Sequence, residues 1–181
     1  MRRQIRSSVF ETNSSSMHSL VVKKNSEYYN DAELREYVWL YDGIWMIRDN
    51  EDITFGRAPF ACLSRFEEKV RYAIASLCGW HGDREERFEE IEELVKELIP
   101  ECTGIILPNV HWYGDEEDKT YYGGVDEDIL SPFLREEGIS LKEFLTNKKY
   151  VVIVDGDEYC IWPSMKEAGL VNLEEIEKEH G

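Results

Sequence analysis

Hydrophobic side chains recur along the chain with two spacings, which predict strands in some segments and helices in others. Two runs rich in aromatic and branched residues, 38–41 and 44–47, lie on either side of Asp42-Gly43. An Asp-Gly pair between such runs is the strongest short-range signal for a β-hairpin. Similar runs around a second Asp-Gly pair predict another hairpin over 150–162. Shorter apolar runs predict strands at 5–10, 20–22 and 103–107.

A spacing of three to four residues between apolar side chains predicts two longer helices. The first covers 64–77 and begins with a capping box formed by Ser64 and Glu67. The second covers 83–99 and is stopped by Pro100, and the two helices are expected to form an antiparallel pair. Another Ser-x-x-Glu box, at 140–143, opens one of the shorter helices, which are expected at 31–37, 127–136, 140–146, 164–168 and 173–179.

This order of elements predicts an α+β fold. Hairpins near both ends with helices between them favour an antiparallel or mixed sheet built from hairpins and covered by helices mainly on one face. The chain has 181 residues, which predicts a single domain over 1–181. Its hydrophobic content of 42%, with 22 aromatic side chains, is sufficient for a core of its own.

The lack of a secretory signal and the pattern of cysteines predict a cytoplasmic protein. Residues 1–6 are basic, but the apolar stretch of a secretory signal does not follow them. The longest apolar runs are far shorter than the roughly 18 residues of a membrane-spanning helix. The four cysteines include no Cys-x-x-Cys pair and are typical of buried thiols in a reducing compartment, so no disulfide is expected.

The charge is strongly negative and unevenly distributed. Asp and Glu number 38 against 21 Lys and Arg, a net charge of −17, and the whole excess arises after residue 50. Such a surface repels phosphate backbones and anionic lipids, which argues against direct binding of nucleic acid or of a membrane. Residues 1–24, however, contain five basic side chains and one acidic side chain, so an anion could bind there.

The polar segment 10–19 is the main candidate for a ligand site. It contains an amide, five hydroxyls, an imidazole and a carboxylate between two predicted strands. Backbone N–H groups and hydroxyls in such a turn can surround a phosphate, and a nearby guanidinium can bind it at two points. The residues predicted to bind the ligand are Arg3, Arg6, Asn13, Ser14, Ser15, Ser16 and Ser19.

The imidazole of His18 is the candidate catalytic group, as a general acid or base at neutral pH. A serine nucleophile activated by His18 is a weaker hypothesis, since no nucleophile elbow or oxyanion-hole pattern accompanies the serines. In the plainest interpretation the serines and Asn13 only form the turn, and His18 begins a strand. Whether the chain is an enzyme stays open.

The sequence Phe-Glu-Thr-Asn-Ser-Ser-Ser-Met-His-Ser over residues 10–19 resembles the N-terminus shared by a group of proteins from bacteriophages and other mobile elements of Gram-positive bacteria. The stretch 144–162 is similar as well. No activity is established for that group. The resemblance therefore implies a setting, a phage or mobile-element protein in a bacterial cytoplasm, and no reaction.

Neither a metal nor a cofactor is predicted. Cys78 and His81 have Cys-x-x-His spacing, and Cys102 and His111 could complete a set of four ligands, but this spacing matches no standard zinc pattern. The acidic runs 115–118 and 126–128 lack the alternating ligands and the glycine of a calcium loop. Both runs are interpreted as solvated surface.

Two hypotheses of function follow. In the first, the N-terminal segment either binds or both binds and modifies a phosphorylated small molecule such as a nucleotide. In the second, the protein is an acidic inhibitor that binds a basic surface of a host protein, for example as a mimic of nucleic acid, through the nine acidic residues of 83–101. Aromatic side chains in predicted loops could form a stacking wall for a base; these are Trp80, Trp112, Tyr113, Tyr121 and Tyr122.

Overall fold

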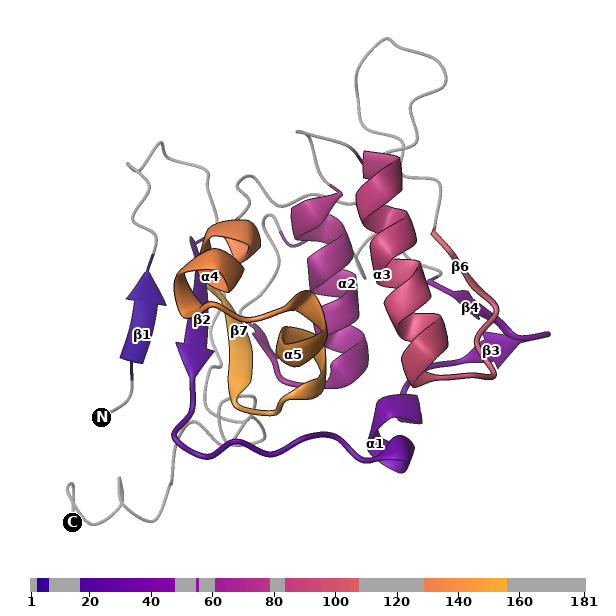
Figure 1. Ribbon diagram of the computed structural model, residues 1–181, viewed down its shortest axis with the longest axis horizontal. Helices are drawn as coiled ribbons and strands as arrows, with labels where there is room; N and C mark the ends of the chain where they lie inside the picture. The colour runs from indigo at the N-terminus through magenta and orange to yellow at the C-terminus, as the bar shows by residue number, and fades with distance from the viewer. Residues whose placement is uncertain are drawn as a thin grey trace, which may run out of the picture.

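The computed structural model (Figure 1) describes residues 3–6, 17–47, 55, 61–78, 84–107 and 129–155, and every structural statement below concerns these residues. Seven strands and five helices form within them, in an order that mixes both types along the chain. The elements are β1 (Arg3–Arg6), β2 (Met17–Val22), α1 (Asp31–Arg35), β3 (Leu40–Tyr41), β4 (Ile44–Met46), β5 (Ala61–Leu63), α2 (Phe66–Leu77), α3 (Arg84–Leu98), β6 (Gly104–Ile106), α4 (Leu130–Glu137), α5 (Leu141–Thr146) and β7 (Tyr150–Asp155).

The larger sheet has four antiparallel strands in the order β1-β2-β7-β5. Alternate residues of its strands point to opposite faces. Leu20, Leu63 and Val152 belong to one face and lie in the main core. Val21 and Val151 belong to the other face and form a small separate cluster with Cys62 and Ile153. The described side chains of β2, β5 and β7 are therefore apolar on both faces.

Helix α2 lies at the centre of the core, beside α3 and between the two sheets (Figure 1). Its side chains Phe66, Val70 and Ile74 are buried together with apolar side chains from both sheets, so a single core joins the two sheets. Helices α4 and α5 add Phe133 and Phe144 to it. This arrangement confirms the predicted α+β class.

The smaller sheet has the order β3-β4-β6, with an antiparallel hairpin β3-β4 and a parallel pair β4-β6. Asp42 and Gly43 form the turn with φ angles of 48° and 80°, the positive pair that a type I′ turn requires. The predicted first hairpin is thus confirmed. The parallel strand β6 makes the sheet mixed, which the local sequence pattern does not specify.

The helix ends partly follow the predicted caps. The hydroxyl of Ser140 accepts a hydrogen bond from the backbone N–H of Glu143 at 3.1 Å, as the box at the start of α5 predicts. At the start of α2 the predicted pair is wrong by one residue. The carboxylate of Glu68, not Glu67, accepts from the backbone N–H groups of Ser64 and Arg65, because the N-cap of α2 is Arg65, which makes Glu68 the third helical residue.

Several predicted elements lie outside the described residues. They include the second strand of the later hairpin, the two helical pieces near the C-terminus, the acidic runs and the five aromatic side chains of the predicted stacking wall. Among the described helices, none combines the length and the apolar character needed to cross a membrane.

Candidate functional site

The strand pair β1-β2 brackets the polar segment predicted to bind an anion. Its antiparallel register sets Arg6 opposite Ser19 and Arg3 opposite Val22. The backbones of Arg6 and Ser19 are thus neighbours at the end of the strand pair that the polar segment connects. Asn13, Ser14, Ser15 and Ser16 are outside the described residues, as are the side chains of Arg3, Arg6 and Ser19.

His18 lies on the core face of β2 with 6% of its surface exposed. Its Nε2 is 2.9 Å from the carbonyl oxygen of Phe55, and its Nδ1 is 3.2 Å from the hydroxyl of Tyr72. Because a carbonyl oxygen only accepts, Nε2 carries a proton, and in the neutral ring Nδ1 accepts from the Tyr72 hydroxyl. The ring is therefore held at both nitrogens, and proton exchange with a ligand requires breaking one of these contacts.

A second candidate site is the exposed side of the smaller sheet. Four large apolar side chains there are open to solvent: Trp39 is 81% exposed, Tyr41 68%, Ile106 51% and Met46 39%. Met46 and Ile106 are direct partners across β4-β6, and extending the hairpin register by one pair sets Trp39 opposite Met46. We call these four residues the apolar face.

The opposite side of the same sheet is buried. Trp45 and Ile105, which are partners across β4-β6, are nearly inaccessible and belong to the main core. Leu40, the partner of Trp45 in β3, packs against that core. One side of the sheet thus builds the core, while the other presents aromatic and aliphatic groups that no described residue covers. Monomeric proteins rarely expose such contiguous apolar surface without a binding role.

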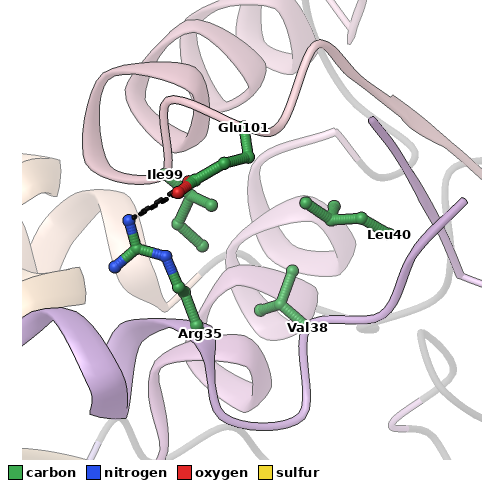
Figure 2. A pocket seen from close by; sticks show the side chains of 5 residues that line it. All are labelled: Arg35, Val38, Leu40, Ile99 and Glu101. Atoms are coloured by element: carbon green, nitrogen blue, oxygen red, sulfur yellow. Dashed lines mark hydrogen bonds and ion pairs between the residues drawn. The ribbon is translucent and has the colours of Figure 1, made fainter. Parts of the chain in front are cut away.

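A cavity of about 260 Å³ lies beneath β3, lined by Arg35, Val38, Leu40, Ile99 and Glu101. Figure 2 shows the aliphatic side chains of Val38 and Leu40 pointing into it, with Ile99 behind the ion pair. The Arg35 guanidinium donates from one nitrogen to both carboxylate oxygens of Glu101, at 3.0 and 3.1 Å. This salt bridge lowers the pKa of Glu101 below its usual 4.5, since hydrogen bonding and charge favour the ionised form. The cavity therefore combines an apolar wall with a charged rim.

Helix α3, which contacts β6 of this sheet, carries a row of acidic side chains. Glu85, Glu89, Glu93 and Glu97 recur at four-residue intervals, so they share one side of the helix, and all four are exposed. Glu93 pairs with a lysine of the same helix, and Glu97 with one from α5. Within the described part of the chain, Glu85 and Glu89 form no ion pair. We call these four residues the acidic row.

Lys69 is the most unusual charged residue of the core, because its side chain is fully buried. Its Nζ donates to the carbonyl oxygens of Phe144 and Asn147 at 2.9 and 3.0 Å, at the C-terminal end of α5. It also lies 4.8 Å from the centre of the Tyr29 ring. Burial, assisted by the charge of Lys23, lowers the pKa of Lys69 well below 10.5. These contacts connect α2 to α5 and give Lys69 a structural role.

The cysteines of the rejected zinc pattern are core residues. Cys78 is the C-cap of α2 and is inaccessible, and burial raises the pKa of its thiol to about 12. Cys102 is also buried, and its thiol donates to the carbonyl oxygen of Gly104. Across the described ranges, no three His, Cys, Asp or Glu side chains come together in a way that could hold a metal. His81 and His111 are outside those ranges.

Sequence reasoning did not identify the apolar face, although a signal was present. In a sheet with one side in solvent, polar and apolar residues alternate. The hairpin runs 38–41 and 44–47 are apolar at consecutive positions, so a sheet with only one buried side must expose half of them. These two runs therefore indicate either a sheet that is covered on both sides or an exposed apolar surface.

Comparison of the chain with protein-family models, with curated proteins and with solved structures finds no match in any of the three.

Proposed function

We propose that this protein is a binding protein that attaches through the apolar face to a basic surface of another protein. The observation that carries the proposal is the exposure of Trp39, Tyr41, Met46 and Ile106 on one side of one small sheet. Burying a large apolar side chain stabilises an interface by roughly 1.5–3 kcal/mol. Tryptophan and tyrosine are also among the residues that most often dominate binding energy.

Charge complementarity supports a basic partner. The net charge of −17 and the acidic row on α3 attract cationic surfaces and repel anionic ones. They also oppose the pairing of two copies of this chain, because both would carry the same charge. Together with the resemblance of residues 10–19 to phage and mobile-element proteins, this favours a host protein as the partner and inhibition as the outcome.

The test uses the purified full chain as bait in an extract of a Gram-positive bacterium. The proposal expects a basic protein to be retained at low salt and released as the salt concentration rises, because exposed charges are screened. The double variant Trp39→Ser/Tyr41→Ser should lose this protein. The matched control Tyr28→Ser, which removes an exposed aromatic side chain from another part of the surface, should keep it. If the wild-type chain, the double variant and the control all retained the basic protein equally, the apolar face would not be the binding surface.

A second proposal concerns the N-terminal segment, where Arg6 lies opposite Ser19 at the end of the strand pair that the polar residues connect. We propose that this segment binds a phosphorylated small molecule, with Arg6 as its cation and Asn13, Ser14, Ser15 and Ser16 as hydrogen-bond donors. The buried ring of His18 would act as acid or base only if a bound ligand displaced the Tyr72 hydroxyl or the Phe55 carbonyl from it.

Native mass spectrometry tests this second proposal. The freshly purified protein should carry an additional mass the size of a nucleotide, and the variant Arg6→Gln/Asn13→Ala should not. If the wild-type protein carries no such mass and no nucleotide raises its melting temperature, the N-terminal segment is a turn without a ligand.

A further inference from the structure

The two edges of the smaller sheet differ. In a two-residue hairpin, the residues next to the turn hydrogen-bond to each other, and the following pair directs its backbone groups away from the partner strand. Tyr41 and Ile44 form the first pair, and Leu40 and Trp45 the second. The N–H and C=O of Leu40 therefore point outward from the edge strand β3. No turn, loop or side-chain hydrogen bond from the described part of the chain ends on them.

The other edge is closed. Strand β6 pairs with β4 through Ile106, whose carbonyl accepts from the N–H of Ile47 at 3.0 Å, so the backbone groups of Ile105 point outward. The carboxylate of Glu92 on α3 accepts a hydrogen bond from that outward N–H at 2.9 Å. A charged side chain thus occupies the donor that another strand would need.

The surroundings of the open edge suit an extended segment. A strand added beside β3 would place alternate side chains on its two sides. On one side lies the cavity lined by Val38, Leu40 and Ile99, and on the other lie the exposed rings of Trp39 and Tyr41. Both sides offer apolar contact.

Charge around this edge selects the occupant. Glu36, Asp42 and Glu101 are exposed near β3. Among the described residues that line the cavity, Arg35 is the one basic side chain, and it is paired with Glu101; the Arg65 guanidinium lies over the ring of Tyr37. A basic segment complements these carboxylates. A second copy of this chain would bring the same acidic groups to the edge and would be repelled.

We propose that the edge of β3 receives an extended, basic segment of the partner protein as an additional strand. This inference rests on the proposed function and specifies how the partner is bound. Backbone hydrogen bonds to Leu40 supply affinity, an aliphatic side chain of the segment fills the cavity, and its basic side chains lie near Glu36, Asp42 and Glu101.

Amide hydrogen exchange of the full-length protein tests the proposal, with a short synthetic peptide of alternating lysine and valine as the probe. In the free protein the Leu40 amide should exchange fast and the Ile105 amide slowly. Saturating peptide should slow exchange at Leu40 by about tenfold or more and leave Ile105 unchanged. The same peptide with methylated backbone nitrogens cannot donate and should not bind.

Two charge variants complete the test. Trp39→Lys/Tyr41→Lys places cations beside the edge and should abolish binding of the basic peptide, whereas Tyr28→Lys, at another exposed aromatic position, should not. Equal binding of the methylated peptide, or binding without protection of Leu40, would overturn strand addition and leave attachment through the apolar face intact. If self-association of the protein without peptide slowed amide exchange at Leu40, the edge of β3 would bind a second copy of the chain, and the proposal of a basic partner segment would be wrong.

Discussion

The carboxylate of Glu92 accepts a hydrogen bond from the backbone N–H of Ile105 at 2.9 Å and a second from the Lys96 ammonium at 2.7 Å. This contact attaches α3 to the edge of β6. Partial burial opposes ionisation of Glu92, but the two hydrogen bonds outweigh it and lower the pKa below the usual 4.5. The ionised carboxylate thus holds the strand edge to the helix.

Replacing Glu92 should therefore expose that edge. Glu92→Ala removes the acceptor, and we expect the Ile105 amide to exchange faster and the free energy of unfolding to fall by about 1–2 kcal/mol. Glu92→Gln keeps an oxygen acceptor and should have a smaller effect. Since the folded pKa is lowered, the contribution of Glu92 is present above pH 4.5 and is lost as the pH falls below it. Unchanged exchange at Ile105 in Glu92→Ala would contradict this account.

Gly43 in the turn of the first hairpin and Gly138 at the C-cap of α4 differ in how closely other atoms surround them. Gly43 and Gly138 both have positive φ, 80° and 64°, so alanine is strained at either position. A Cβ on Gly43 would lie 3.0 Å from the Thr103 hydroxyl and 3.2 Å from the Glu101 carbonyl oxygen, whereas one on Gly138 would meet nothing within 4 Å. Gly43→Ala should thus lower the free energy of unfolding by about 1 kcal/mol more than Gly138→Ala. If urea denaturation showed that both variants lose the same free energy of unfolding, the hairpin turn would not be packed against residues 101–103.

The buried lysine predicts a distinctive dependence of stability on pH. The pKa of Lys69 is lowered in the folded protein, so the unfolded chain binds the extra proton in the range between that pKa and 10.5. Stability should therefore rise with pH in this range. Lys69→Met removes this rise and takes the ammonium donor away from the carbonyl oxygens of Phe144 and Asn147, of which the Asn147 oxygen keeps the Tyr150 N–H. We expect this to cost about 2–4 kcal/mol near pH 7.

Urea denaturation of both proteins between pH 7 and pH 10 checks this prediction, and the difference between them isolates Lys69 from the other titrating groups. A stability difference that does not change with pH would mean that Lys69 titrates normally in the folded protein.

The contacts of His18 can be tested by a double-mutant cycle with Tyr72. His18→Phe removes the hydrogen bonds at both ring nitrogens and should lower the free energy of unfolding by about 1–3 kcal/mol. Tyr72→Phe removes only the hydroxyl. The double variant should lose less than the sum of the two, because they share the bond between Nδ1 and the hydroxyl. Strictly additive losses would indicate that this bond contributes nothing.

Local patterns predicted the five described helices and the first hairpin, because these elements depend on neighbouring residues. The stripe of Phe66, Val70 and Ile74 follows the helical period, and Asp42-Gly43 fits one type of turn. The parallel pairing of β4 with β6 was not predicted, because it joins residues about sixty positions apart in the sequence. The burial of Lys69 was not predicted either, because a lysine on a helix is usually exposed and its acceptors lie on the distant α5.

The candidate site was less predictable than the fold. Residue types suggested a phosphate site near Asn13 and His18, yet residue types alone do not specify that His18 points into the core towards Tyr72. The apolar face depends on which side of a small sheet remains uncovered. That is decided by the whole arrangement of helices, since the strand sequence is apolar on both sides.

The most direct test of the central claim, that the apolar face binds a basic partner, is site-specific photo-cross-linking in living cells. A photoreactive phenylalanine analogue at position 39 should form a covalent adduct with a basic protein in a host bacterium, whereas the same analogue at position 28 should not. If position 39 yields no adduct, or if both positions capture the same proteins, the apolar face is not the binding surface.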